Sequence, residues 1–147
     1  MFHIILERTK RDIPEAAHKS QLPGALEYRV RNLVVPGDLE RHNLMITFKP
    51  SPPQWAAGIP ACDYPSVFTD VDRRRLHVNG DTSLCLWAPH DPPERRWWHR
   101  DGLHSLVEIV RRHLLFEIHW SRTGGPRGGE WPVEDAPHGR SAVRSAS

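Results

Sequence analysis

Cys85 is the residue of this chain whose surroundings most favour covalent chemistry. It lies in the stretch HVNGDTSLCLW (residues 77–87), where a turn of small residues precedes it. A cysteine nucleophile needs a reactive thiolate and a group that stabilises the developing oxyanion. His77 and Asn79 lie just upstream, on the far side of the turn, and the Asn79 amide donates hydrogen bonds without taking up a proton. The spacing therefore makes Asn79 a candidate for oxyanion stabilisation.

The alternative interpretation of Cys85 is a buried and unreactive thiol. Free cysteine is among the most buried residue types. Leu84, Leu86 and Trp87, which flank this position, are apolar. Taken alone, the stretch favours this structural role.

A further candidate is His138, which stands between Pro137 and Gly139 in an irregular segment. Imidazole exchanges a proton near neutral pH, so a histidine folded back over a cleft can act as acid or base. An exposed loop position is the simpler interpretation. Elsewhere, His113 and His119 lack the spacing of a zinc-binding pair, and no Cys-x-x-Cys is present. The sequence therefore predicts no metal and no cofactor.

Hydrophobic patterns indicate which elements position these residues. A helix is predicted over residues 13–21, with Pro14 near its first turn. Alternating apolar residues predict strands over residues 28–35, 42–50 and 66–72. A Pro-Gly turn separates the first two strands, which indicates an antiparallel hairpin.

The clearest helix is predicted in the stretch DGLHSLVEIVRRHLLFEIHWSRTGG. Its apolar residues recur at helical spacing: Leu103, Leu106, Val107, Val110, Leu114 and Ile118. Asp101 is the predicted N-cap, and Gly124 or Gly125 is expected to end the helix. Strands followed by one strong helix indicate an α+β fold.

Tryptophans mark the Pro-rich segments, which are expected to be ordered loops. Trp55 is a predicted anchor in residues 51–65. Five others follow Cys85: Trp87, Trp97, Trp98, Trp120 and Trp131. Large amphipathic rings of this kind pin loops to a core. A nucleic-acid stacking surface with the nearby arginines is the alternative, and we expect the structural role.

Composition sets further limits. The chain has 147 residues, 38% hydrophobic and 26% charged, with a formal net charge of +2. These values predict one globular domain over residues 1–139, followed by a disordered tail over 140–147. Two cysteines form no disulfide framework, so a reducing cytoplasm is expected. The N-terminus lacks a signal-peptide pattern, and no apolar run approaches the ~20 residues of a membrane helix.

The segment YPSVFTDVD…RLHVNGDTSLCLW resembles the active-site region of ubiquitin-conjugating enzymes. Tyr64-Pro65 matches the family's Tyr-Pro loop. His77-Val78-Asn79 matches its His-Pro-Asn motif, with valine in place of proline. Leu84-Cys85-Leu86 matches its active-site cysteine motif. The resemblance implies a ubiquitin-conjugating-like fold, with an N-terminal helix, an antiparallel β-meander, an active-site loop and a C-terminal helix.

Later segments are similar to a narrower set, the bacterial ubiquitin-conjugating-like proteins of CBASS antiphage operons. They are SLCLWAPHDPPERRWW, DGLHSLVEIVRRHLLFEIHW, TGG and EWPVEDAPHG. In that family a cysteine forms a thioester with the C-terminus of a cGAS-like cyclic-nucleotide synthase. The resemblance implies a short, stand-alone type, with Cys85 as nucleophile, Asn79 at the oxyanion, His77 bracing the turn and His138 as an acid or base candidate.

Two other functions compete with this hypothesis. One is a Cys–His hydrolase that uses Cys85 with His138 as its base. The other is a binding module that keeps the fold and does no chemistry. Fold alone does not decide among the three.

Overall fold

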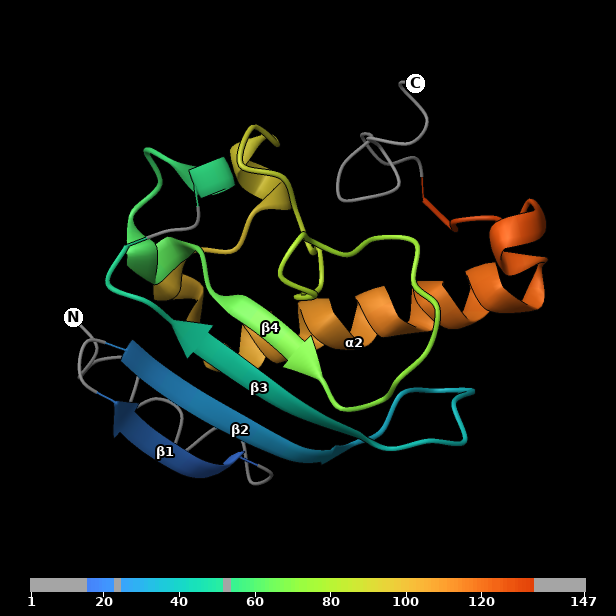
Figure 1. Cartoon of the computed structure of the whole chain (residues 1–147), viewed down its shortest axis with the longest axis horizontal. Coiled ribbons are helices and arrows are strands. Elements are labelled where there is room, and N and C mark those ends of the chain that lie inside the picture. The colour runs from blue at the N-terminus through green and yellow to red at the C-terminus, as the bar shows by residue number, and fades with distance from the viewer. Residues whose placement is uncertain (1–15, 23–24, 52–53, 134–147) are drawn as a thin grey trace.

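The computed structural model describes residues 16–22, 25–51 and 54–133. Four strands form one sheet in the order β1-β2-β3-β4, and all neighbours are antiparallel. They are β1 (Ala16–Leu22), β2 (Ala25–Leu33), β3 (His42–Phe48) and β4 (Ser66–Thr69). One long helix follows, α2 (Gly102–Arg122), so the fold is α+β (Figure 1). Short 3-10 turns lie between and after these elements: η1 (Gln54–Ala56), η2 (Ala61–Asp63), η3 (Pro93–Arg95), η4 (His99–Asp101) and η5 (Gly125–Arg127).

The predicted hairpin and third strand are confirmed, with β2 beginning and ending earlier than predicted and β3 and β4 ending earlier. β2 and β3 pair antiparallel with Tyr28 opposite Ile46, and β4 continues the meander. The predicted helix over residues 13–21 is wrong where the structure describes it, because β1 begins at Ala16. Its backbone pairs with β2 as far as Leu22. This pairing overrides the helix preference of its alanine, lysine and glutamine residues. Residues 1–15 lie outside the described part of the chain.

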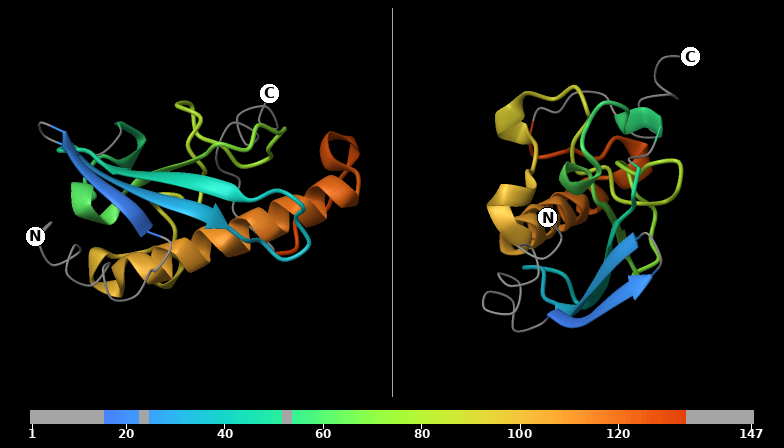
Figure 2. Two further views of the ribbon diagram at one scale, coloured as in Figure 1. Left: turned by 90° about the horizontal axis from the view of Figure 1, so that it is seen from below. Right: turned by 90° about the vertical axis from the view of Figure 1, so that its left-hand side faces the viewer.

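The core lies between the sheet and α2, which form two layers (Figure 2). Along β3, Leu44, Ile46 and Phe48 are buried at every second position, as the alternation of a half-buried strand requires. The predicted apolar stripe of α2 is confirmed, since all six of its residues are buried. The helix begins after Asp101, but this residue makes no side-chain cap. Its carboxylate instead accepts a hydrogen bond from the Trp98 backbone N–H at 3.0 Å.

Trp97 joins the Pro-rich loop to this core. Its side chain is 1% exposed, and its ring lies 5.9 Å from that of Phe48. The indole N–H donates to the Gly102 carbonyl at 2.9 Å, at the start of α2. Trp87 is buried too, which agrees with the predicted role of tryptophan in the loops. The side chain of Trp55 lies outside the described residues.

Arginines of the segment after β4 meet a buried carboxylate of α2. Arg75 donates to Glu117, whose side chain is only 1% exposed, and Arg73 lies 3.9 Å from the same carboxylate oxygen. Burial raises the pKa of Glu117, and the two arginines oppose this rise without cancelling it. Arg73 also donates to Asp38 at 2.8 Å, which is bonded to buried His42 at 2.8 Å. We call these five residues the buried ion-pair network.

The buried ion-pair network links three segments of the chain. Asp38 lies in the β2–β3 connection and His42 begins β3, the two arginines follow β4, and Glu117 lies on α2. Hydrogen bonds to Asp38, that of His42 foremost, outweigh burial and lower its pKa.

No helix within residues 16–22, 25–51 and 54–133 is long and apolar enough to cross a membrane.

Candidate active site

Cys85 lies on a strand-like segment that runs alongside β4. The backbone N–H of Leu84 donates to the Val67 carbonyl at 2.8 Å, and that of Cys85 donates to the His77 carbonyl at 3.2 Å. Val78 and Leu84 form an antiparallel bridge. Residues 77–85 therefore form a tight hairpin, which we call the cysteine hairpin. The Cys85 side chain is 4% exposed.

Asp81 and Ser83 fix the tip of the cysteine hairpin. The Asp81 carboxylate accepts hydrogen bonds from the backbone N–H of Ser83 at 3.0 Å and from its hydroxyl at 2.6 Å. Thr82 has φ +74°, a left-handed conformation that a threonine rarely adopts. Its N–H donates to the Asn79 carbonyl at 3.0 Å, and the Asn79 N–H donates to the Ser83 carbonyl at 2.8 Å. Hydrogen bonds on both sides of the turn hold this conformation in place.

Asn79 lies across the cysteine hairpin from the residues that precede Cys85. Its side-chain NH₂ donates to the Ser83 hydroxyl at 3.1 Å and to the Leu84 carbonyl at 3.3 Å. Both amide hydrogens therefore have acceptors in the hairpin. In this state Asn79 positions the backbone next to Cys85, and binding an oxyanion requires that one of these bonds be exchanged.

Replacing Asn79 by alanine is expected to lower the free energy of unfolding by about 1–2 kcal/mol, because the buried Leu84 carbonyl loses its side-chain donor. Chemical denaturation followed by circular dichroism measures this change. His90→Ala is the control, since His90 is exposed in the following loop. An Asn79→Ala protein as stable as the wild type would show that these bonds do not hold the hairpin.

His77 joins the cysteine hairpin to α2. Its side chain is buried, and its ring lies 4.5 Å from that of Trp131 and 6.4 Å from that of His113 on α2. Trp131 also contacts His113, with ring centroids 5.3 Å apart. The segment after α2 thus returns to pack against the hairpin. His138, the predicted acid or base, lies outside the described residues, so its role stays a prediction.

A groove of about 520 Å³ lies beside the cysteine hairpin, between the following loop, α2 and the segment around Trp131. Acidic, basic and apolar side chains line this groove. They are Leu86, Asp91, Glu94, Arg95, Arg96, Asp101, Ser105, Ile109, Arg112, His113, Phe116, Trp131 and Val133. Leu86 directly follows Cys85 in the chain, and Cys85 itself is not among the residues that line the groove. Its mixed polar lining suits an extended peptide better than an apolar ligand.

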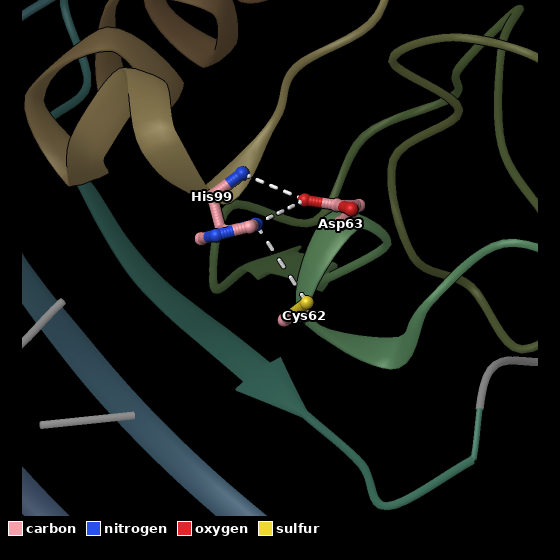
Figure 3. A group of neighbouring side chains, drawn as sticks. All are labelled: Cys62, Asp63 and His99. Carbon is pink, nitrogen blue, oxygen red and sulfur yellow. Dashed lines mark hydrogen bonds and ion pairs between the residues drawn. The ribbon is translucent and has the colours of Figure 1, made fainter. Parts of the chain in front are cut away.

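The other cysteine lies in a cluster that sequence reasoning missed. Cys62 and Asp63 belong to η2, and His99 begins η4 (Figure 3). The His99 Nδ1 lies 2.8 Å from an Asp63 carboxylate oxygen and 3.7 Å from the Cys62 sulfur. The only signal in the sequence is an adjacent Cys-Asp pair in a Pro-rich loop. The histidine follows more than 30 residues later, and no motif spacing links them.

The Cys62 cluster does not have the geometry of a nucleophile–base pair. In such a pair the base uses one ring nitrogen for the thiol, and the other binds the orienting carboxylate. Here Cys62 and Asp63 both approach the same nitrogen of His99. Burial, followed by the negative charge of Asp63, raises the pKa of the Cys62 thiol. Cys62 is therefore held in its unreactive protonated form.

Comparison of the chain with protein-family models, with curated proteins and with solved structures gave no match. The α+β class rests on the strands and helix described above. The resemblance to ubiquitin-conjugating enzymes stays a hypothesis that rests on the sequence motifs around Cys85.

Proposed function

We propose that this chain is a ubiquitin-conjugating-like acyl carrier of CBASS antiphage defence, which forms a thioester through Cys85. Its substrate would be the C-terminus of a cGAS-like nucleotidyltransferase. The observation that carries the proposal is the cysteine hairpin. The Asn79 side chain donates to the Leu84 carbonyl, and the His77 carbonyl accepts from the Cys85 N–H, so the motif residues hold both polar groups of the peptide unit that precedes Cys85.

The order of elements supports the same proposal. An antiparallel meander comes first, the cysteine segment packs beside its last strand, and one long helix lies across the sheet. That order agrees with the one that the motif resemblance implies. An N-terminal helix would have to lie within residues 1–15, outside the described part of the chain.

The proposed reaction is a transfer between two thiols. The incoming acyl group arrives as a thioester of a separate activating protein, because a free carboxylate does not acylate a thiol. The Cys85 thiolate attacks the carbonyl carbon and its new S–C bond forms. The bond from that carbon to the donor sulfur then breaks, and the proton lost by Cys85 ends on the donor thiol. The groove beside Leu86 would hold the last residues of the incoming chain.

Peptide mapping by mass spectrometry tests the proposal, with the chain co-expressed with a cGAS-like nucleotidyltransferase and its activating protein. We expect a thiol-sensitive adduct on the peptide that contains Cys85 and none on the peptide that contains Cys62. Cys85→Ala should lose the adduct completely. Cys85→Ser should retain the adduct as an ester that thiols do not cleave. The same adduct on the Cys85→Ala protein would contradict the proposal.

The burial of Cys85 favours one second candidate, a non-catalytic binding module. At 4% exposure the sulfur behaves as a small core side chain, and an acyl group reaches it only if neighbouring side chains move. A phage-challenge assay separates the two functions. Full protection by Cys85→Ser would support the binding module, and loss of protection with the fold intact would support acyl transfer.

A further inference from the structure

The Cys62 cluster brings together three kinds of metal-binding atom. The Cys62 sulfur, an Asp63 carboxylate oxygen and a His99 ring nitrogen all lie within 4.8 Å of one another. They come from two separate turns, η2 and η4, whose side chains point toward one another (Figure 3). Cys62 and Asp63 are buried, and the His99 side chain is 40% exposed. The cluster thus has a protein side and a solvent side.

The distances suit a tetrahedral metal. Zinc binds sulfur at about 2.3 Å and nitrogen or oxygen at about 2.0–2.2 Å, which places neighbouring ligand atoms about 3.3–3.6 Å apart. The sulfur and the ring nitrogen are 3.7 Å apart, close to this range. The nitrogen and the carboxylate oxygen, now 2.8 Å apart through a hydrogen bond, would separate by roughly half an ångström.

The ligand set selects the metal. Calcium and magnesium require oxygen ligands, whereas thiolate and imidazole together suit zinc. Three protein ligands leave the fourth position of a tetrahedron for water, on the solvent side where His99 is exposed. The Asp63 oxygen that lies near His99 Nδ1 also accepts a 2.8 Å bond from the His99 backbone N–H. A carboxylate oxygen has two lone pairs, so the ion can take the place of the ring hydrogen bond while the backbone bond stays.

We propose that Cys62, Asp63 and His99 form a zinc-binding site. Binding displaces the proton of the Cys62 thiol and leaves the His99 proton on Nε2, so Nδ1 is free to coordinate. The ion fastens the loop that contains Tyr64 to the turn that precedes α2. Tyr64 in turn donates to the Trp87 carbonyl at 3.3 Å, two residues beyond Cys85. Through Tyr64, the zinc site therefore stabilises the start of the loop that follows the cysteine hairpin.

Cobalt substitution tests the zinc site on the full chain without using any reaction of Cys85. Co²⁺ added to the metal-free protein should give a near-ultraviolet thiolate-to-metal band, and Zn²⁺ should displace it. Cys62→Ser should abolish the band, and His99→Gln should weaken Zn²⁺ binding by at least ~100-fold, since even residues that only support a ligand contribute ~10–100-fold. Cys85→Ser and His104→Gln are the matched controls, and both should keep the band.

Circular dichroism of each variant separates loss of the site from loss of the fold. As an independent measurement on the wild type, Zn²⁺ should raise the midpoint of thermal unfolding and Mg²⁺ should not. Absence of both the cobalt band and this shift would overturn the proposal. A band that survives in Cys62→Ser and disappears in Cys85→Ser would overturn it as well.

Discussion

Replacing Arg75 by alanine is expected to lower the free energy of unfolding by about 3–5 kcal/mol at neutral pH. The change leaves the carboxylate of Glu117, which is 1% exposed, without its closest counter-charge. Arg73, at 3.9 Å, compensates only in part. A small domain has only about 5–15 kcal/mol of net stability, so this loss is a large share of it.

The pKa of Glu117 gives the prediction a pH dependence with a definite sign. Burial already raises this pKa above its ordinary value of 4.5, and removal of Arg75 raises it further. A carboxyl group with a raised pKa in the folded state stabilises the protein below its unfolded pKa, and this contribution is lost as the pH rises through the folded value. The loss caused by Arg75→Ala should therefore be smaller near pH 5 than at neutral pH.

Urea denaturation at both pH values measures these changes. Arg74→Ala is the matched control, because Arg74 is exposed between the two paired arginines and should change stability by no more than ~0.5 kcal/mol. The double variant Arg75→Met/Glu117→Leu removes both charges and should recover most of the loss. A double variant less stable than Arg75→Ala would contradict the explanation by an uncompensated buried charge.

Trp97→Ala is expected to cost about 3–5 kcal/mol, the range for removing a large aromatic side chain from a core. Trp97 fills the space beside Phe48 and is 1% exposed, so alanine leaves a cavity between the sheet and the loop. The start of α2 also loses the indole hydrogen bond to the Gly102 carbonyl. Both effects act on the segment that carries the proposed ligand His99.

The neighbouring tryptophan provides the comparison. Trp98 is partly exposed, and its ring lies under the guanidinium groups of Arg96 and Arg100 at 4.8 and 5.4 Å. Trp98→Ala should therefore cost no more than ~1 kcal/mol. Trp97→Phe keeps most of the volume and should cost less than Trp97→Ala. Chemical denaturation of the three variants measures these differences, and equal losses for Trp97→Ala and Trp98→Ala would contradict the assignment of Trp97 to the core.

The sequence predicted best what depends on local periodicity. The apolar stripe from Leu103 to Ile118 repeats at helical spacing and predicts α2. Alternating apolar residues and a Pro-Gly turn predict the hairpin of β2 and β3. The helix predicted over residues 13–21 rests on a proline near its first turn, and the structure has β1 from Ala16 instead. Its strand form depends on hydrogen bonds to β2, which no local pattern of residues 16–22 reveals.

The sites illustrate the same limit. The turn before Cys85 is visible in the sequence because its residues are consecutive. The Cys62 cluster and the Arg75–Glu117 pair each join residues more than 30 positions apart. Only the packing of the Pro-rich loops and of α2 brings them together. Glu117 is a charged residue on the buried face of α2. Its partner Arg75 comes from the segment after β4, so the helix pattern alone does not reveal the pair.

The hydrogen bond from Leu84 to the Val67 carbonyl has a consequence for access to Cys85. β4 is an edge strand of the sheet. The unpaired backbone groups of an exposed edge can pair with other chains and cause aggregation. The cysteine hairpin covers part of this edge, because its Leu84 N–H donates to the Val67 carbonyl. Opening the hairpin to expose the sulfur would uncover this edge. In the proposed reaction, we therefore expect the acyl donor to reach Cys85 by displacing side chains while the backbone pairing stays closed.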